Sequence, residues 1–226
     1  MKAFVIALEG QSYERLSKTI GDIELEEFRA TTPETIKDDR KLFSKFNWTW
    51  PLHSTQDGLD MKTGLYKFVY QAEDQGKKVA CSLSHMRLWQ KCVELDEPII
   101  VFESDAVVTR KIDPFFFEGI KVLGLNDPRG ATRRSNVFHD KLVTKGEGMH
   151  PVPTVNNADE NPVPQGLAGN SAYYIEPEGA KLLLDGADEY GMWPNDAFMC
   201  KELFPWIRTV YPYYTKISGA ESTTTR

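Results

Sequence analysis

Short apolar runs alternate along the chain with longer segments of helical periodicity, and this alternation constrains the fold more than any other feature. Residues 3–8 and 99–102 are continuous apolar runs of strand length, and residues 172–175 form a third. A strand that is apolar at successive positions is typical of the buried interior of a sheet. The pattern predicts a layered α/β fold.

Residues 82–95 have the clearest helical pattern. Leu83, Met86, Trp89 and Val93 fall on one helical face, and Ser82 or Ser84 could cap the first turn. Other helices are expected at residues 12–20, 64–75 and 195–203 and after Pro177.

The sequence contains no convincing linker between domains, so residues 1–226 are expected to form one domain. Residues 126–169 are polar and rich in proline and glycine, which is typical of a functional or mobile loop. Residues 218–226 are polar and are expected to fray.

Charge and length exclude several classes of protein. The net charge is −6, and no block of lysine or arginine is present, so nucleic acid and anionic membrane surfaces are poor partners. The apolar run at residues 3–8 is too short for a transmembrane helix or a usual signal peptide. Three cysteines without a CxxC pair are expected to be reduced packing residues. We therefore expect a cytoplasmic protein with no transmembrane segment.

Two acidic residues follow the apolar run at 99–102 directly. Glu103 and Asp105 are one residue apart, at the carboxyl end of an expected strand, where α/β proteins commonly bind ligands. Two carboxylates in this place suit Mn²⁺ or Mg²⁺. The alternative is a solvated pair of acids with no ligand.

Two further segments could carry chemistry. Ser84 and His85 lie near the expected start of a helix, where free N–H groups attract phosphate, although simple capping explains the same residues. Asp196 follows Trp193-Pro194-Asn195 and could act as a general base near an aromatic surface. The alternative for Asp196 is an acid favoured by a helix dipole.

Taken in order, these segments resemble glycosyltransferase family 25, which includes lipooligosaccharide and collagen galactosyltransferases. The similar segments are FVI at residues 4–6 with Arg15, CSLSH at 81–85, PIIVFESDA at 98–106, GNSAYYI at 169–175, GAKLL at 179–183 and PNDAF at 194–198.

The resemblance implies a GT-A-type fold, a nucleotide-sugar-binding sandwich with a mostly parallel central sheet flanked by helices. It implies inverting transfer of a hexose, galactose by preference, from a UDP-sugar to a hydroxyl of a glycan, a lipid-linked sugar or a glycoprotein. Mn²⁺ or Mg²⁺ is the implied cofactor, and residues 126–169 are the implied lid on the acceptor side. The implied roles are donor binding by Leu8, Arg15, Ser84, His85 and Glu103, metal binding by Glu103 and Asp105, and base catalysis by Asp196.

The chain also departs from the family pattern. Ala7 and Glu9 replace the usual Asn and Asp after the first strand, and residues 30–33 lack the acid and the glycine of the family's second-strand motif. Ser104 replaces the middle acid of the family's EDD motif. These changes leave open a catalytically weakened relative that only binds a sugar or a nucleotide. A metal-dependent phosphatase is a weaker alternative, because its nucleophilic Asp would have to stand where this chain has Glu103.

Overall fold

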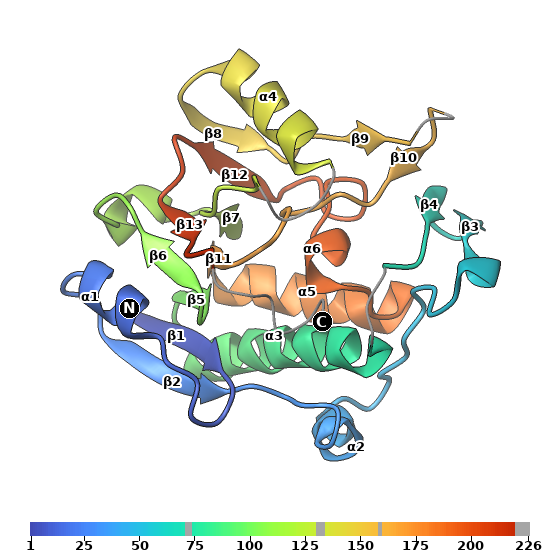
Figure 1. Cartoon of the computed structure of the whole chain (residues 1–226), viewed down its shortest axis with the longest axis horizontal. Helices are drawn as coiled ribbons and strands as arrows, with labels where there is room; N and C mark the ends of the chain where they lie inside the picture. Colours follow the sequence, from blue (N-terminus) through green and yellow to red (C-terminus); the bar gives the residue numbers. More distant parts are fainter. Residues whose placement is uncertain (71–73, 130–133, 158–159, 220–226) are drawn as a thin grey trace.

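The computed structural model describes residues 1–70, 74–129, 134–157 and 160–219. Its centre is a mixed seven-stranded sheet in the order β2-β1-β5-β11-β7-β12-β8 (Figure 1). The sheet strands are β1 (Lys2–Ala7), β2 (Leu25–Arg29), β5 (Ile99–Glu103), β7 (Val122–Gly124), β8 (Gly148–Pro151), β11 (Ala172–Ile175) and β12 (Arg208–Tyr211). β1 pairs in parallel with both β2 and β5, and β7 pairs in parallel with β12. β11 is antiparallel to both of its neighbours, and β8 is antiparallel to β12. The expectation of an α/β fold with a central sheet is confirmed.

The apolar run of β5 forms the middle of the protein, because both of its faces are covered. Ile99 and Val101 contribute to one hydrophobic core, and Ile100 and Phe102 contribute to the other. All four side chains are fully buried. Side chains of a strand alternate between its two faces, so a run that is apolar at every position requires a cover on each side.

Two long helices cover one face of the sheet. α3 (Gln75–Leu95) and α5 (Pro177–Tyr190) pack against each other, and they lie side by side in Figure 1. The other face is covered by α1 (Glu14–Thr19) and the 3-10 helix η3 (Pro114–Phe117). An antiparallel pair of strands, β6 (Ala106–Val108) and β13 (Thr215–Ile217), lies on the same face. Helices therefore cover both faces of the sheet, and a separate hydrophobic core lies on each face.

α3 begins seven residues before the expected start at residue 82. Asp74 is its N-cap and accepts a hydrogen bond from the N–H of Gly76 at 2.7 Å. Ser82 and Ser84 instead lie inside the helix, where each hydroxyl donates to the carbonyl four residues earlier. The prediction that either serine caps the helix, and that the helix start there attracts phosphate, is therefore wrong. The start of α3 could not be predicted from periodicity, because its first turns are polar and lack an apolar stripe.

The helix expected at residues 64–75 is also absent from residues 64–70, and the only described helical residue of that segment is Gln75, where α3 begins. β4 (Leu65–Lys67) pairs there with β3 (Gly58–Asp60) in an antiparallel ladder. Lys67 is buried, and its ammonium lies 2.6 Å from the carboxylate of Asp60. This tertiary ion pair overrides the weak helical pattern.

The segment at residues 126–169 is more structured than the sequence indicated. It contains α4 (Ser135–Lys145), β8, β9 (Val155–Asn156) and β10 (Pro162–Val163). Phe138 and Leu142 of α4 are buried in the core, which explains why this polar segment forms a helix. The remaining short elements are α2 (Ile36–Asp39), η1 (Arg40–Leu42), η2 (Ser54–Gln56) and α6 (Asn195–Phe198).

The backbone at residue 218 contacts the turn that follows β5. Ser218, expected in a frayed tail, donates from its backbone N–H to the carbonyl of Asp105 at 2.8 Å. Residues 220–226 of that expected tail lie outside the described residues.

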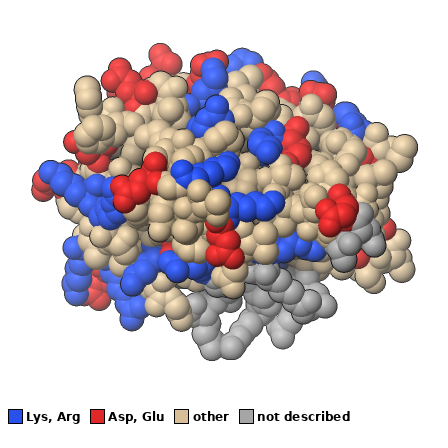
Figure 2. Space-filling model, turned by 90° about the horizontal axis from the view of Figure 1, so that it is seen from above, with Lys and Arg blue, Asp and Glu red and all other residues tan. Residues whose placement is uncertain are grey.

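The molecular surface matches the mixed charge of the sequence. On the face shown in Figure 2, basic and acidic side chains are interspersed, and no block of a single sign stands out among the described residues. None of the described helices combines the length and the apolar character that a membrane crossing needs.

Gly179 provides a test of the packing between α5 and the sheet. A Cβ atom at this position would lie 2.2 Å from the backbone carbonyl oxygen of Lys121, which cannot move without shifting the start of β7. We expect Gly179→Ala to destabilise the fold by about 1–3 kcal/mol, as overpacking does. The midpoint of thermal unfolding should fall by roughly 2–12 °C.

Gly58→Ala is the matched control, because no heavy atom lies within 4 Å of a Cβ built there. Calorimetry of both variants checks the prediction. An unchanged midpoint for Gly179→Ala would contradict it.

Candidate active site

A pocket of about 550 Å³ opens at the carboxyl ends of β1, β2 and β5. The three strands are parallel neighbours, so the residues that follow them meet at one edge of the sheet. Six of the residues named from the sequence line this pocket: Leu8, Arg15, Ser84, His85, Glu103 and Asp105. Asp196 is not in its lining, but it is close enough for its charge to act on Glu103.

The turn after β5 places the two acidic residues. Glu103 is the last residue of β5, and Ser104 and Asp105 form the turn that leads into β6. The backbone of Asp105 is held by Ser218, whose own carbonyl accepts a hydrogen bond from Arg15 at 3.2 Å. The C-terminal strand and α1 therefore fix the position of Asp105 together.

Ser84 holds the loop after β2 against α3. Its hydroxyl accepts from the backbone N–H of Thr31 at 2.8 Å and donates to the carbonyl of Ala80 at 3.0 Å. Thr31 is held a second time, because its own hydroxyl donates to Asp39 at 2.7 Å. Residues 30–33, where the chain departs from the family pattern, thus form one fixed wall of the pocket.

A buried hydrogen-bond relay orients His85. Trp89 Nε1 donates to the hydroxyl of Tyr173 at 2.9 Å, and that hydroxyl lies 3.0 Å from His85 Nδ1. The tyrosine hydroxyl thus joins Trp89 to His85 Nδ1, and the tautomer of the ring sets which of the two atoms donates. The other ring nitrogen, Nε2, faces Glu103 Oε1 at 3.5 Å. Burial lowers the pKa of His85 to about 3, so the ring is neutral.

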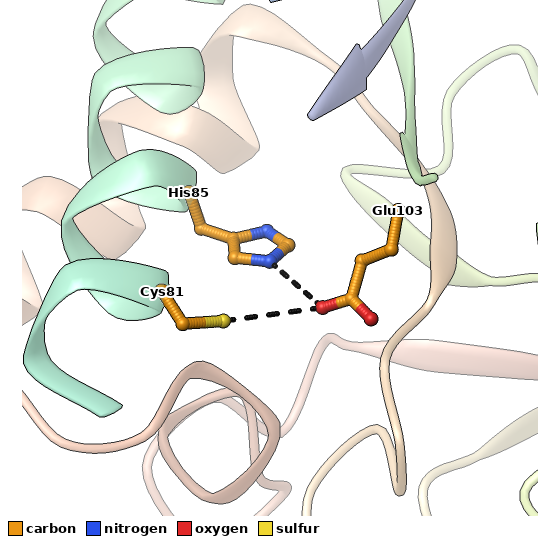
Figure 3. A group of neighbouring side chains, drawn as sticks. All are labelled: Cys81, His85 and Glu103. Atoms are coloured by element: carbon orange, nitrogen blue, oxygen red, sulfur yellow. Dashed lines mark hydrogen bonds and ion pairs between the residues drawn. The ribbon is translucent and has the colours of Figure 1, made fainter. Parts of the chain in front are cut away.

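Cys81 approaches Glu103 from the same helix, one turn earlier. Its Sγ lies 3.9 Å from Glu103 Oε1, and Figure 3 shows Cys81 and His85 pointing toward the same carboxylate oxygen. The possible ligand atoms of the three residues lie within 4.8 Å of one another. Burial raises the pKa of the Cys81 thiol well above its usual value, so the S–H remains protonated. The Cys81 thiol therefore donates a weak hydrogen bond to Glu103, whereas His85 Nε2 lies beside Glu103 with no hydrogen-bond partner among the described residues.

Acidic side chains are concentrated beside the pocket. Burial and then the charge of Asp196 raise the pKa of Glu103 to about 8. Burial and then Glu103 raise the pKa of Asp105 to about 6, and burial raises the pKa of Asp196. Lys78 is the cation that opposes this effect at Glu103 and Asp196.

The two acids after β5 have the chemistry of a site for a hard cation. Asp105 Oδ1 is buried and has no hydrogen-bond partner among the residues that the structure describes, so it can accept from a ligand. Glu103 supplies a second carboxylate oxygen at the pocket wall. Oxygen ligands of this kind suit Mn²⁺ or Mg²⁺, so the residues present fit the implied cofactor.

Comparison with known proteins agrees with the order of these segments. The model of glycosyltransferase family 25, described as LPS biosynthesis proteins, matches residues 1–199. The chain belongs to glycosyltransferase family 25. This match covers all three strands that carry the pocket, the helix with Ser84 and His85, and the segment with Asp196.

Other comparisons add little to the family match. Among solved structures, the apo form of mouse xyloside xylosyltransferase 1 is similar over 91% of this chain and 69% of that chain, with 12% identity and a TM-score of 0.35. No curated protein sequence matches the chain.

Two residues of the site were not selected in the sequence analysis, Lys78 and Tyr173. Lys78 lies three residues before Cys81 and seven before His85, so all three share one face of α3. This spacing could have revealed Lys78 only with the correct helix start. Tyr173 was noticed as a strand residue, but its contact with His85 joins residues 88 positions apart.

The raised pKa of Glu103 predicts how the stability of this family 25 enzyme depends on pH. The folded protein holds this proton up to a pH of about 8, whereas the ordinary pKa of a glutamate side chain, as in the unfolded chain, is 4.5. Between these two values the native state binds more protons than the unfolded state, so stability falls as the pH rises. In a chelating buffer, the unfolding midpoint of Glu103→Gln should fall less over this window than that of the unchanged protein.

The exposed Glu178→Gln is the control, since this residue lies on the outer side of α5. Thermal unfolding at several pH values measures the difference. Parallel curves for Glu103→Gln and the unchanged protein would contradict the prediction.

Proposed function

We propose that the protein transfers a hexose, galactose by preference, from a UDP-sugar to an acceptor hydroxyl with inversion at the anomeric carbon, on a GT-A-type fold. The observation that carries the proposal is the pocket, in which six sequence-predicted residues meet at the carboxyl ends of three parallel strands. Family membership supports a nucleotide-sugar donor.

The donor nucleotide occupies the side of the pocket formed by α1 and the loops after β1 and β2. Leu8 and Arg15 lie there, and the backbone turn at Leu8 is fixed by Gln11, whose side chain accepts from the N–H of Leu8 at 2.9 Å. Ser84 acts as a positioning residue, because its hydroxyl is already hydrogen bonded to the backbone on both sides. Arg15 is the group of suitable charge for the diphosphate.

The donor sugar lies beside Glu103, between the nucleotide and Asp196. Cys81 donates a weak hydrogen bond to Glu103, and His85 packs beside it, so the side chain of Glu103 is positioned before the donor arrives. A Mn²⁺ or Mg²⁺ ion held by Glu103 and Asp105 would neutralise the charge of the leaving diphosphate.

Asp196 accepts the proton of the acceptor hydroxyl as the oxygen attacks the anomeric carbon. The bond from that carbon to the UDP oxygen breaks on the opposite face, which inverts the configuration. Burial raises the pKa of Asp196 and thereby makes it a stronger base than an exposed aspartate. The acceptor is a glycan, a lipid-linked sugar or a glycoprotein, and residues 126–169 form its side of the site.

Thermal unfolding with UDP, UDP-galactose and UDP-glucose, each with and without Mn²⁺, tests the donor site. A ligand at 100 times its dissociation constant adds about 2.7 kcal/mol, or roughly 5–11 °C for a chain of this size. We expect the full rise only with nucleotide and Mn²⁺ together. No rise with any nucleotide would overturn the proposal. A rise without hydrolysis or transfer from any UDP-sugar would identify a weakened binding relative.

A further inference from the structure

A group of aromatic side chains lies beside Asp196, outside the donor pocket. The ring of Trp50 lies 5.2 Å from that of Tyr70 and 5.7 Å from that of Trp193, which precedes Asp196 by three residues. Phe68 and Tyr70 are also in contact, with ring centroids 5.7 Å apart. Neither Phe68 nor Tyr70 is fully buried, and neither lines the donor pocket. The group therefore presents an aromatic surface next to the proposed base.

A cation without an acidic partner lies on this surface. The guanidinium carbon of Arg134 lies 4.8 Å from the ring centroid of Phe68. Within the part of the chain that the structure describes, no carboxylate is within ion-pair distance of Arg134. Arg129, by contrast, forms a two-pronged pair with Asp127, with its shortest contact at 2.6 Å. The charge of Arg134 is thus available to a ligand.

Tyr70 links this cation to the base. The charges of both Asp196 and Arg134 act on its hydroxyl, and burial raises its pKa well above the usual value. The phenol therefore keeps its proton and can donate a hydrogen bond. Phe68, which contacts Arg134, and Tyr70, on which the charge of Asp196 acts, therefore connect the cation to the proposed base.

We propose that Phe68, Tyr70 and Arg134 form the acceptor subsite and that the acceptor is a sugar with an anionic substituent, a phosphate or a carboxylate. Aromatic side chains pack against the apolar face of a sugar ring, and a guanidinium matches the geometry of either anion. The reacting hydroxyl of the acceptor then faces Asp196, while its anionic group contacts Arg134. This inference rests on the proposed function, because the role of Asp196 defines which side receives the acceptor.

Direct binding of small sugars tests the subsite without any donor. The probes are glucose, glucose 6-phosphate and glucuronate, with binding measured by titration calorimetry or ligand-observed NMR. We expect both charged sugars to bind at least about tenfold more tightly than glucose, the effect of one hydrogen-bonded charge. Stronger binding of the phosphate would identify a phosphorylated acceptor, and stronger binding of glucuronate an acidic sugar.

Arg134→Met removes the charge but keeps the aliphatic contact with Phe68. It should abolish the preference for the charged sugars, a loss of about 10–100-fold, and leave the binding of UDP with Mn²⁺ unchanged. Arg129→Met is the matched control, since that guanidinium is already paired, and it should keep the preference. Arg134→Lys should keep part of the preference for the charged sugars.

The outcomes separate the two proposals. Equal binding of charged and neutral sugars by the unchanged protein would overturn the subsite, as would equal losses for glucose and the charged sugars in Arg134→Met. Arg134-dependent binding of a charged sugar in a protein that shows no response to UDP would support the subsite and overturn the transferase proposal. Binding of UDP with Mn²⁺ without any preference for charged sugars would overturn only the subsite.

Discussion

Asp196→Asn is expected to reduce the rate of sugar transfer by about 10²–10⁴-fold, the usual contribution of a general base. The amide has nearly the same shape as the carboxylate but cannot accept the proton of the acceptor hydroxyl. Asp196 lies at the start of α6 and outside the lining of the donor pocket, so the affinity for UDP with Mn²⁺ should be retained. Removing its charge also removes the second cause of the raised pKa of Glu103, which favours the ionised form of that residue.

Single-turnover transfer and nucleotide titration, carried out on the same preparation, separate catalysis from binding. Asp185→Asn is the matched control, because this exposed residue of α5 pairs only with Lys181 on the surface. Full transfer activity in Asp196→Asn would exclude Asp196 as the base. Loss of nucleotide binding would instead assign it to the donor site.

Asp105→Ala is expected to abolish the part of UDP binding that depends on Mn²⁺. The Oδ1 atom of Asp105 is well placed to bind a cation at the end of β5. No described residue donates a hydrogen bond to this atom. The rise of roughly 5–11 °C expected with UDP and Mn²⁺ should therefore disappear.

The same substitution should not lower the stability of the protein without ligand. Burial raises the pKa of Asp105 to about 6, which means that the folded state disfavours its charge at neutral pH. Thermal unfolding in a chelating buffer checks this, with the exposed Asp38→Ala as the control. An unchanged response to UDP and Mn²⁺ would refute the metal role of Asp105.

The local parts of the fold could be predicted because their signals lie within a few residues. The apolar run of β5 and the acids that end it are adjacent in the sequence, so both the strand and the site at its end followed from one segment. The order of the motifs likewise indicated the family that the match over residues 1–199 shows. The start of α3 was missed, because its first turns carry no apolar stripe and its capping residue, Asp74, precedes them.

The sequence by itself determined the α/β class, the strands β1 and β5 and the family, since these depend on local periodicity and on motifs in a fixed order. Only the tertiary structure decided that Ser84 holds the loop after β2, that Tyr173 contacts His85, and that Arg134 lies over Phe68. Each of these contacts joins residues more than fifty positions apart. Such partners are chosen by how the layers pack around the sheet, and no local pattern of side chains encodes that choice.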